Sequence, residues 1–408
     1  MSGILSTAES APGPPTVIVW LVFCASVTAI LLGSFVGSAG AYAFLALWMI
    51  LGGIYARTSV RILSSYGMIW VFPIFALMSV LWSQNFTDSL KFGAEYVGTA
   101  GCAILAAALL KPRQVISALM CCLLLTAILS IAVGKSAMDP LTGITTFVGV
   151  FESKNQLGFF VSIMLLGSLA LILDAGQPLL FRVIGLLALG LDGPLLIMTR
   201  SGTAQVTAVL ASGVLVGNLL VSRLPRFGRA RLFFAFIVIM LPSVALLGVA
   251  GDGVHDFVVK VMGKDTTLTG RTLLWHHAMD LIPDHPLLGY GFQAFWRRND
   301  VQAESFWSEF HVLSRQGFHF HSTYMESLIE VGFVGTAALV LTIICVIGGV
   351  VRWSWSTGSV PASFFVSIMA CLLIRSFVEV DVMFQFQIGT FLLFLAAYYG
   401  FLRPSVGR

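Results

Sequence analysis

Histidine and arginine side chains gather in one polar stretch of this sequence, between Gly251 and Tyr324. Histidine is the usual general base near neutral pH, and arginine grips phosphate oxygens through a planar fork of N–H groups. Arg271 lies in this stretch, directly after a threonine and a glycine. All seven histidines of the chain lie there too: His255, His276, His277, His285, His311, His319 and His321. We therefore expect the chemistry of the protein to take place in this stretch.

Further cationic groups stand where helices are predicted to begin. Lys154, Arg200 and His321 each lie beside one of three such starts. A helix start has free N–H groups and a partial positive charge, so it binds anions readily. If the three starts converge, these side chains would form a cationic pocket, and Arg271 could close it.

Of the two histidines nearest a helix start, His321 is the better candidate for a general base. Thr323 and Glu326 have the spacing of a capping box, so we expect Thr323 to cap the helix. His321 would then be held by the helix start, whereas His319 lies further out, close to Gly317. A base must be held within hydrogen-bond reach of its proton, so we assign this role to His321 and a supporting place to His319.

Each of these residues also has a simpler interpretation. A single arginine at a helix end often extends to lipid headgroups. The joint pattern favours anion binding for Arg200 and Arg271, and the two interpretations are balanced for Lys154. We interpret the remaining histidines as solvated loop residues: His255, His276, His277, His285 and His311.

Charged residues within or at the ends of the predicted spans are further candidates for a supporting role. Asp192 lies inside a span about two turns from Arg200, where we expect an ion pair or a helix break rather than chemistry. Arg375 and Glu379 are four residues apart on one predicted helix face, and Asp381 follows. This group would either support the pocket or be paired at the membrane interface.

The sequence predicts no metal ion and no other cofactor. No Asp-x-Asp pattern occurs, and the nearest one is Glu379-Val380-Asp381. Arginine side chains can neutralise a diphosphate without a cation.

Composition decides the fold class. Of the 408 residues, 58% are apolar and 10% are charged. A soluble domain has about 25% charged residues, so this chain could not cover an aqueous surface. The apolar runs are too long for barrel strands, which leaves an all-α polytopic membrane protein surrounded by membrane lipids. The net charge of +4 is too diluted to indicate a nucleic-acid partner.

We predict about twelve transmembrane helices. The predicted spans are 17–37, 40–56, 66–83, 91–110, 114–134, 156–174, 179–199, 203–222, 231–250, 323–351, 360–379 and 383–402. One integral membrane domain would thus contain helices one to nine in residues 1–250, a periplasmic loop in residues 251–322, and helices ten to twelve in residues 323–408.

Positive charge orients the chain in the membrane, because lysine and arginine favour the cytoplasmic side. The strongest indication is the cluster of Arg223, Arg226, Arg229 and Arg231. It places both termini in the cytoplasm and the histidine-rich loop in the periplasm. We therefore expect a multi-pass protein of the bacterial inner membrane with its active site facing the periplasm.

Part of the loop has the pattern of an amphipathic helix. Between Arg271 and Ile282, apolar Leu274, Ala278 and Leu281 recur at helical spacing, and Pro283 ends the run. We expect a short helix that lies on the membrane surface.

Several motifs in this order resemble the O-antigen ligase and Wzy-type polymerase superfamily. They are Phe151-Glu152-Ser153-Lys154-Asn155-Gln156-Leu157-Gly158, Thr199-Arg200-Ser201-Gly202-Thr203, Thr269-Gly270-Arg271 with Trp275, His285-Pro286-Leu287-Leu288-Gly289-Tyr290-Gly291, and His321-Ser322-Thr323-Tyr324 with Glu326, Glu330 and Gly332. The match covers residues 145–335, and the twelve-span frame extends it to most of the chain. One departure is Ser322, where the family usually has asparagine or a similar residue.

The resemblance implies a glycosyltransferase that acts on the periplasmic face. Its donor would be a glycan on undecaprenyl diphosphate, and its acceptor a sugar hydroxyl on a glycan or a lipid-linked glycan. Arg200 and Arg271, with Lys154 beside them, would bind the donor diphosphate, and His321 would be the base. Other polysaccharide assembly proteins are further partners compatible with such a reaction.

The residues fit this chemistry without the family name. Placed cations stabilise the charge that develops on a lipid diphosphate leaving group, and histidine can take the acceptor proton. The expected mechanism is in-line attack at the anomeric carbon with inversion. The short motifs favour an exopolysaccharide polymerase. The alternatives are an O-antigen ligase acting on lipid A core and, more distantly, a transporter or flippase of lipid-linked sugars.

Overall fold

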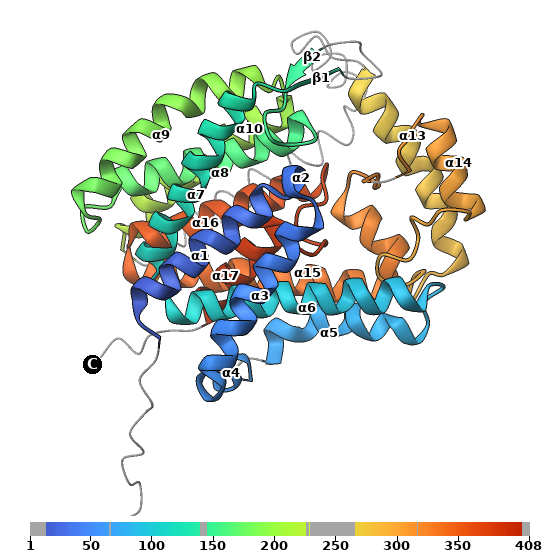
Figure 1. The fold of residues 1–408 in the computed structure, drawn as a ribbon, viewed down its shortest axis with the longest axis horizontal. Coiled ribbons are helices and arrows are strands. Elements are labelled where there is room, and N and C mark those ends of the chain that lie inside the picture. Colours follow the sequence, from blue (N-terminus) through green and yellow to red (C-terminus); the bar gives the residue numbers. More distant parts are fainter. Residues whose placement is uncertain are drawn as a thin grey trace, which may run out of the picture.

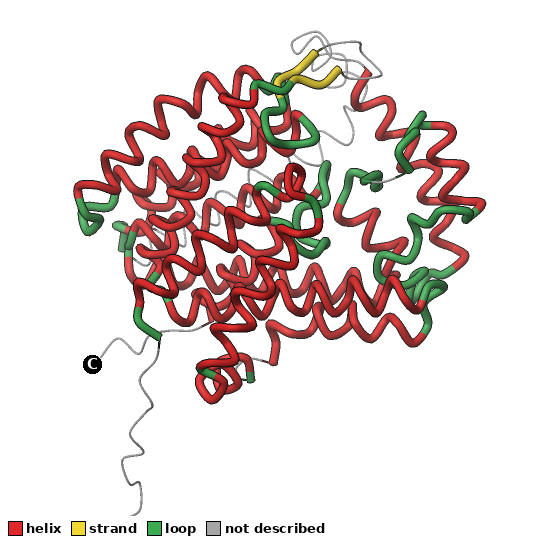
Figure 2. Tube along the Cα trace, in the orientation of Figure 1, coloured by secondary structure: helices red, strands yellow, loops and turns green. Residues whose placement is uncertain are grey.

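The computed structural model describes residues 14–64, 67–138, 145–225, 228, 266–315 and 317–401, and these are mostly helical (Figures 1 and 2). The helices before the first strand are α1 Thr16–Leu31, α2 Gly33–Val36, α3 Ser38–Ile54, α4 Ala56–Leu63, α5 Val71–Met78, α6 Phe86–Leu109 and α7 Pro112–Val133. The later helices are α8 Lys154–Leu173, α9 Leu179–Met198, α10 Gly202–Ser222, α13 Thr266–Leu281, α14 Val301–Glu309, α15 Thr323–Thr357, α16 Val360–Ser376 and α17 Ile388–Phe401. Short 3-10 helices lie at Gly67–Trp70, Ser79–Leu81 and Ile282–Asp284.

Membrane-spanning length is reached by six helices of the described residues: α6, α7, α8, α9, α10 and α15. α3 and α4 together would give a seventh span, although they are bent by 109°. α1, α16, α17 and the segment Gly67–Leu81 are shorter apolar helices. The all-α polytopic membrane fold is thus confirmed. The number twelve stays a prediction, and the predicted span 231–250 lies outside the described residues.

Polar residues and glycines make several elements shorter than predicted. The span expected at 17–37 is divided at Leu32 into α1 and α2, and Gly37, with a left-handed φ of 64°, ends α2. The span expected at 383–402 begins only at Ile388, because the polar segment before it forms a turn. The one expected at 360–379 ends at Ser376, which leaves Glu379 outside the helix.

A small β-hairpin between α7 and α8 was not predicted. Strand β1, Ser136–Met138, pairs antiparallel with β2, Thr145–Phe147, and Ser136 lies opposite Phe147 (Figure 2). Each strand has only three residues, which is too short for an alternating pattern to be recognised in a sequence.

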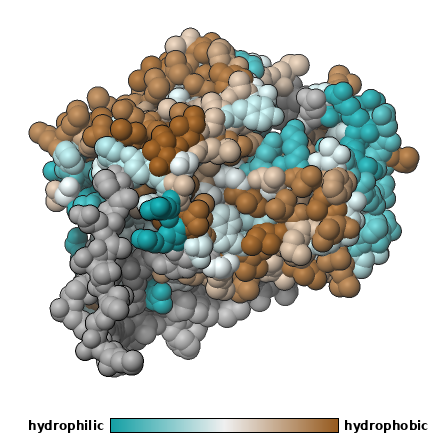
Figure 3. Space-filling model, turned by 60° about the horizontal axis from the view of Figure 1, so that its bottom comes forward, coloured by the Kyte–Doolittle hydropathy of each residue, from teal (hydrophilic) through white to brown (hydrophobic). Residues whose placement is uncertain are grey.

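The core of the bundle is built around α8, which is the most enclosed of the long helices, whereas α9 is the most exposed. α8 packs against α7, α9, α10 and α16. The surface is largely hydrophobic over the helical body, while hydrophilic residues gather at the end formed by α13 and α14 (Figure 3). Apolar side chains face outward on the body because lipid, rather than water, is the expected surroundings.

The predicted amphipathic helix exists as part of α13, but its apolar face does not lie on a membrane. Leu274, Ala278 and Leu281 are buried inside the protein. They belong to a separate hydrophobic cluster with Tyr290, Phe295, Phe306, Phe320 and Ile329. The expectation of a membrane-bound face was wrong because aromatic residues of the same polar stretch, including those of α14, cover it.

The polar stretch between α13 and α15 is hydrogen-bonded to α15 at a break in that helix. Gly332 has φ 64° and ψ −170°, which interrupts the helix. The backbone groups around the break are paired with another segment instead: Tyr290 N donates to Ile329 O, Gly291 N to Glu330 O, Phe333 N to Pro286 O and Val334 N to Leu287 O. Unpaired backbone groups would be costly here, so the segment and the break stabilise each other.

Gly289→Ala should loosen this junction. Gly289 has φ +69°, and an added Cβ would lie 2.5 Å from the carbonyl carbon of Glu330. Gly317 is a matched control, because it has φ +68° but open space around a Cβ. Gly317→Ala should lower the free energy of unfolding only by the cost of holding alanine in a left-handed conformation, which is about 1–2 kcal/mol. Limited proteolysis between α13 and α15 should be much faster in Gly289→Ala than in Gly317→Ala, and equal rates would contradict this reading.

Candidate active site

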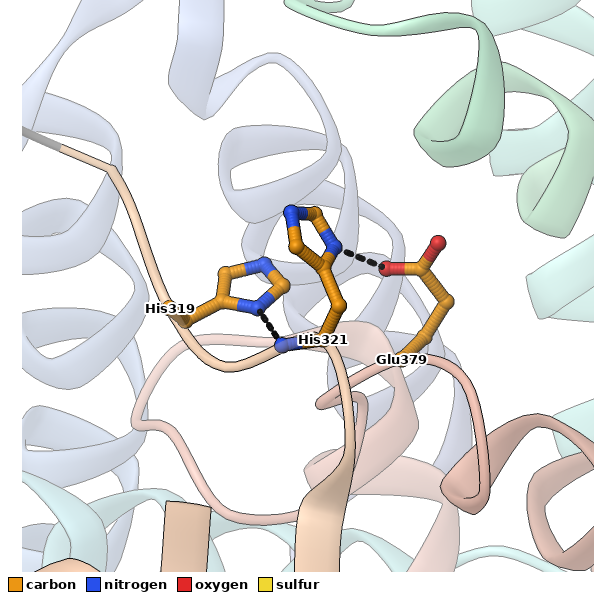
Figure 4. A group of neighbouring side chains, drawn as sticks. All are labelled: His319, His321 and Glu379. Carbon is orange, nitrogen blue, oxygen red and sulfur yellow. Dashed lines mark hydrogen bonds and ion pairs between the residues drawn. The ribbon is translucent and has the colours of Figure 1, made fainter. Parts of the chain in front are cut away.

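Glu379 lies at the centre of the candidate site, in the turn that follows α16. Its Oε1 accepts hydrogen bonds from Arg271 Nη2 and from Asn155 Nδ2, each at 2.8 Å. Its Oε2 lies 3.5 Å from His321 Nδ1 (Figure 4). The Glu379 side chain is only 8% exposed. One buried carboxylate thus contacts α13, α8 and the segment that leads into α15.

The three predicted helix starts do converge here. Ser201, the N-cap of α10, donates its hydroxyl to Asn155 Oδ1 at 2.8 Å. Thr323, at the start of α15, donates its N–H and its Oγ1 to the carbonyl oxygen of Glu379 at 3.1 and 2.8 Å. Asn155, near the start of α8, completes the chain from α10 to Glu379. The starts of α8, α10 and α15 therefore meet, which is the condition that the hypothesis of a cationic pocket required.

The cap of α15 differs from the prediction by one residue. Ser322 is the N-cap, with its Oγ accepting from the N–H three residues on. Thr323 instead points its hydroxyl at Glu379. The Glu326 carboxylate accepts from Phe320 N–H at 2.7 Å, not from the cap residue. The expected capping box is wrong because the second Glu326 oxygen accepts from Trp296 Nε1 at 2.9 Å, so both carboxylate oxygens have donors other than the cap residue.

His319 and His321 are held together. His321 adopts a left-handed φ of 49°, and its backbone N–H donates to His319 Nδ1 at 3.0 Å (Figure 4). The centroids of the two imidazole rings are 4.3 Å apart. Burial, together with the neighbouring His321, lowers the pKa of His319 to about 3, so its ring stays neutral and can accept this bond. The expectation that Gly317 would leave His319 loosely held was wrong.

The two nitrogens of the His321 ring have different surroundings. Nδ1 faces Glu379, and the other ring nitrogen points away from Glu379 (Figure 4). The His321 side chain is 30% exposed, so it remains accessible. The Nδ1 contact is longer than an ordinary hydrogen bond, as is common for catalytic contacts without substrate.

Glu379 is ionised at neutral pH. Burial opposes its charge, but the neighbouring His321, Arg375 and Arg271 hold the pKa of the Glu379 carboxyl well below its usual range. The site therefore contains a fixed negative charge next to the predicted base.

Arg375 and Asp381 hold the turn that carries Glu379. Arg375 Nε and Nη2 donate to the Asp381 carboxylate at 2.6 and 3.2 Å, and Arg375 is only 1% exposed. Its guanidinium lies over the ring of Phe159, 4.3 Å from the centroid. Contrary to the prediction, Arg375 and Glu379 do not share a helix face, because α16 ends at Ser376. The partner of Arg375 is Asp381, and a role of this pair in supporting the site stays a prediction.

Lys154 and Arg200 lie beside the hydrogen-bonded chain. Lys154 is the first residue of α8 and precedes Asn155. Arg200 connects α9 to α10, is exposed, has a left-handed φ of 50°, and precedes Ser201. Both cations are thus placed next to residues that link the helix starts.

Asp192 does not join the site. It is 1% exposed, and Ser168 donates its hydroxyl to Asp192 Oδ2 at 3.0 Å. α9 continues through this position to Met198. Within the described ranges no cation pairs with Asp192, so the expected ion pair or helix break is not found. A serine on neighbouring α8 provides the partner instead.

Asn155 was missed as a site residue by sequence reasoning. It lies inside a quoted motif, but its bridging role joins residues that are 46 and 224 positions away. Its place next to a predicted N-cap was a signal that it would be near the helix start. Nothing local indicated the contact with Glu379.

His319, His321 and Glu379 also have the geometry to attract a metal ion. One potential ligand atom from each lies within 4.8 Å of the others. However, Glu379 Oε1 already accepts from Asn155 and from Arg271, whose guanidinium at 2.8 Å would repel a divalent cation. Metal independence stays our prediction.

Chelation should therefore leave activity intact. Purified protein treated with EDTA should transfer glycan at the untreated rate, because Arg271 and the helix starts supply the positive charge. Loss of transfer on chelation, restored by Mg²⁺ or Mn²⁺, would make Glu379 and His321 candidate metal ligands and contradict the prediction.

Comparison with known proteins identifies the family of this chain. A family model described as O-antigen ligase matches residues 186–340, which include Arg200, Arg271 and His321. The chain is also 32% identical over 362 residues to the exopolysaccharide production protein ExoQ of Rhizobium meliloti (strain 1021), covering 88% of this chain and 83% of the relative. The chain therefore belongs to the O-antigen ligase and Wzy-type polymerase superfamily, in its exopolysaccharide branch.

Proposed function

We propose that this protein is a glycosyltransferase that polymerises an exopolysaccharide on the periplasmic face of the bacterial inner membrane. Its donor is a glycan on undecaprenyl diphosphate, and its acceptor is a sugar hydroxyl. Family membership and the name of the ExoQ relative support the class of reaction. The observation that carries the proposal is the meeting of Arg271, His321 and three helix starts around Glu379.

The cations bind the donor. Arg271 uses one N–H of Nη2 on Glu379, so other N–H groups of its guanidinium can bind phosphate oxygens. Arg200 and Lys154 stand at the starts of α10 and α8, which add partial positive charge. This positive field stabilises the diphosphate as it leaves.

His321 activates the acceptor. The acceptor hydroxyl gives its proton to the His321 ring nitrogen that points away from Glu379, and its oxygen forms a bond to the anomeric carbon. The bond from that carbon to the diphosphate oxygen breaks, and its electron pair leaves with undecaprenyl diphosphate. Attack from the side opposite the leaving group inverts the anomeric configuration. No metal takes part in these steps.

Release of the lipid product tests the proposal. Purified protein would be given undecaprenyl diphosphate carrying a labelled repeat unit, prepared from membranes of a strain that lacks this protein. We expect free undecaprenyl diphosphate and a longer labelled glycan. Movement of intact donor across vesicles without release would indicate a carrier, and it would overturn the proposal.

A ligase is the alternative within the same family, because the matching family model is described as O-antigen ligase. The same assay separates the two functions when lipid A core is added. Transfer of label to lipid A core, with no growth of the glycan itself, would identify the ligase. The relative named for exopolysaccharide production favours polymerisation.

Topology is a separate prediction that the proposed face requires. A reporter that is active only in the periplasm should be active when fused near Ala303, in α14, and inactive near Arg226, within the arginine cluster. The opposite pattern in intact cells would contradict the orientation and the periplasmic site together.

A further inference from the structure

We propose that Glu379 is the positioning residue of this site, and that one carboxylate both orients the base and holds the donor-binding arginine. Its Oε2 would keep His321 with the proton on Nδ1, so that Nε2 accepts the acceptor proton. Its Oε1 would fix the position of Arg271. The inference deepens the proposed function and rests on it.

The contacts of Glu379 divide cleanly between its two oxygens. Oε1 accepts from Arg271 and Asn155, and Oε2 faces only His321 among the contacts of the described residues. The Asn155 amide is itself held by Ser201. The orientation of the carboxylate is therefore fixed from α8 and α10 before any substrate binds.

The backbone of Glu379 is fixed as firmly as its side chain. Its N–H donates to Arg375 O at 2.7 Å, which closes the turn after α16. Its carbonyl oxygen accepts two bonds from Thr323, at the start of α15. Since Thr323 lies two residues after His321, the carboxylate and the imidazole are held to one another through both backbone and side chain. A group that only filled space would not need this arrangement.

A carboxylate in this place selects the reactive nitrogen. A negative oxygen beside Nδ1 favours the tautomer with hydrogen on Nδ1, which leaves the Nε2 lone pair free. When His321 takes the acceptor proton, the same carboxylate stabilises the imidazolium. The charged and titratable groups near His321 are Glu379, Arg271 and His319, and Glu379 is the one that opposes the repulsion from Arg271.

Glu379→Gln tests this role, since glutamine keeps the size and an oxygen for Arg271 but has no charge. We expect kcat for glycan transfer to fall by about 10²-fold or more, with the donor KM nearly unchanged. Glu379→Asp keeps the charge, and it should recover part of the kcat.

Glu309→Gln is the matched control. Glu309 Oε2 lies 3.1 Å from His277 Nδ1, between α14 and α13, and both side chains are 37% exposed. This variant removes the same kind of histidine–carboxylate contact from the same polar stretch, but away from Glu379. It should transfer glycan with the wild-type kcat and the wild-type donor KM.

The possible outcomes distinguish failure of the positioning role of Glu379 from failure of the proposed function. If Glu379→Gln keeps the wild-type kcat, or if the lost kcat is not partly recovered in Glu379→Asp, the positioning role is overturned. If His321→Ala is inactive in the same assay, the proposed function still stands. If the wild-type protein releases no undecaprenyl diphosphate at all, the proposed function fails before any variant is compared.

Discussion

His321→Ala should abolish polymer formation. Loss of a general base typically lowers the rate by about 10²–10⁴-fold, and His319 is a poor substitute because its Nδ1 already accepts the His321 backbone N–H. The variant should still reach the membrane, because the His321 side chain is 30% exposed and is not part of the buried core. Labelled glycan transfer at equal protein level is the measurement.

His319→Ala provides the comparison. His319 accepts the His321 backbone N–H, so its loss should loosen the base without removing it. A lost neutral hydrogen bond costs about 0.5–1.5 kcal/mol, which corresponds to about a 2- to 13-fold slower rate at most. Equal losses in the two variants, or near-normal polymer from His321→Ala, would contradict the assignment of the base.

Arg271→Lys should also lose most of the activity. Lysine keeps the positive charge but lacks the planar fork that can bind Glu379 and phosphate oxygens at once. Each charge-assisted contact is worth about 1.5–3 kcal/mol, so one lost contact should lower kcat/KM by about 10- to 150-fold. Weaker donor binding should appear as a higher donor KM, in contrast to Glu379→Gln.

Arg297→Lys is a suitable control for the loss of a planar guanidinium group. Arg297 pairs with Asp300 at 2.9 Å and donates to Gln84 O, in the polar stretch but apart from Glu379. It should leave transfer close to wild type. If Arg271→Lys were as active as the parent protein at equal expression, Arg271 would not be part of the diphosphate clamp.

Much of the site was predictable because its signals are local. Helix starts are recognised from capping residues, and Ser201 does cap α10 as the polar run at 200–203 indicates. Once the helix starts are recognised, the sequence also shows which cationic side chains lie beside them. Composition alone requires an all-α membrane protein, since the backbone must satisfy its own hydrogen bonds in lipid.

Other features were not predictable because they join distant residues. Arg271 and Glu379 are 108 positions apart, and Asn155 and Glu379 are 224 apart. A sequence window shows Arg375 and Glu379 as helix neighbours, but α16 ends first and Arg375 pairs with Asp381. Where a helix ends depends on the contacts available to the chain beyond it, which only the folded protein defines.

The sequence by itself determined that this is a helical membrane protein in which Lys154, Arg200 and His321 each lie beside the start of a helix. Composition and local hydrogen bonding are enough for that. Tertiary structure decided that the apolar face of α13 is covered by protein, that the break at Gly332 is closed by the segment around Gly289, and that Glu379 is shared by Arg271 and His321. These three depend on packing between remote segments, because burial and charge at each position are set by the neighbours that folding brings to it.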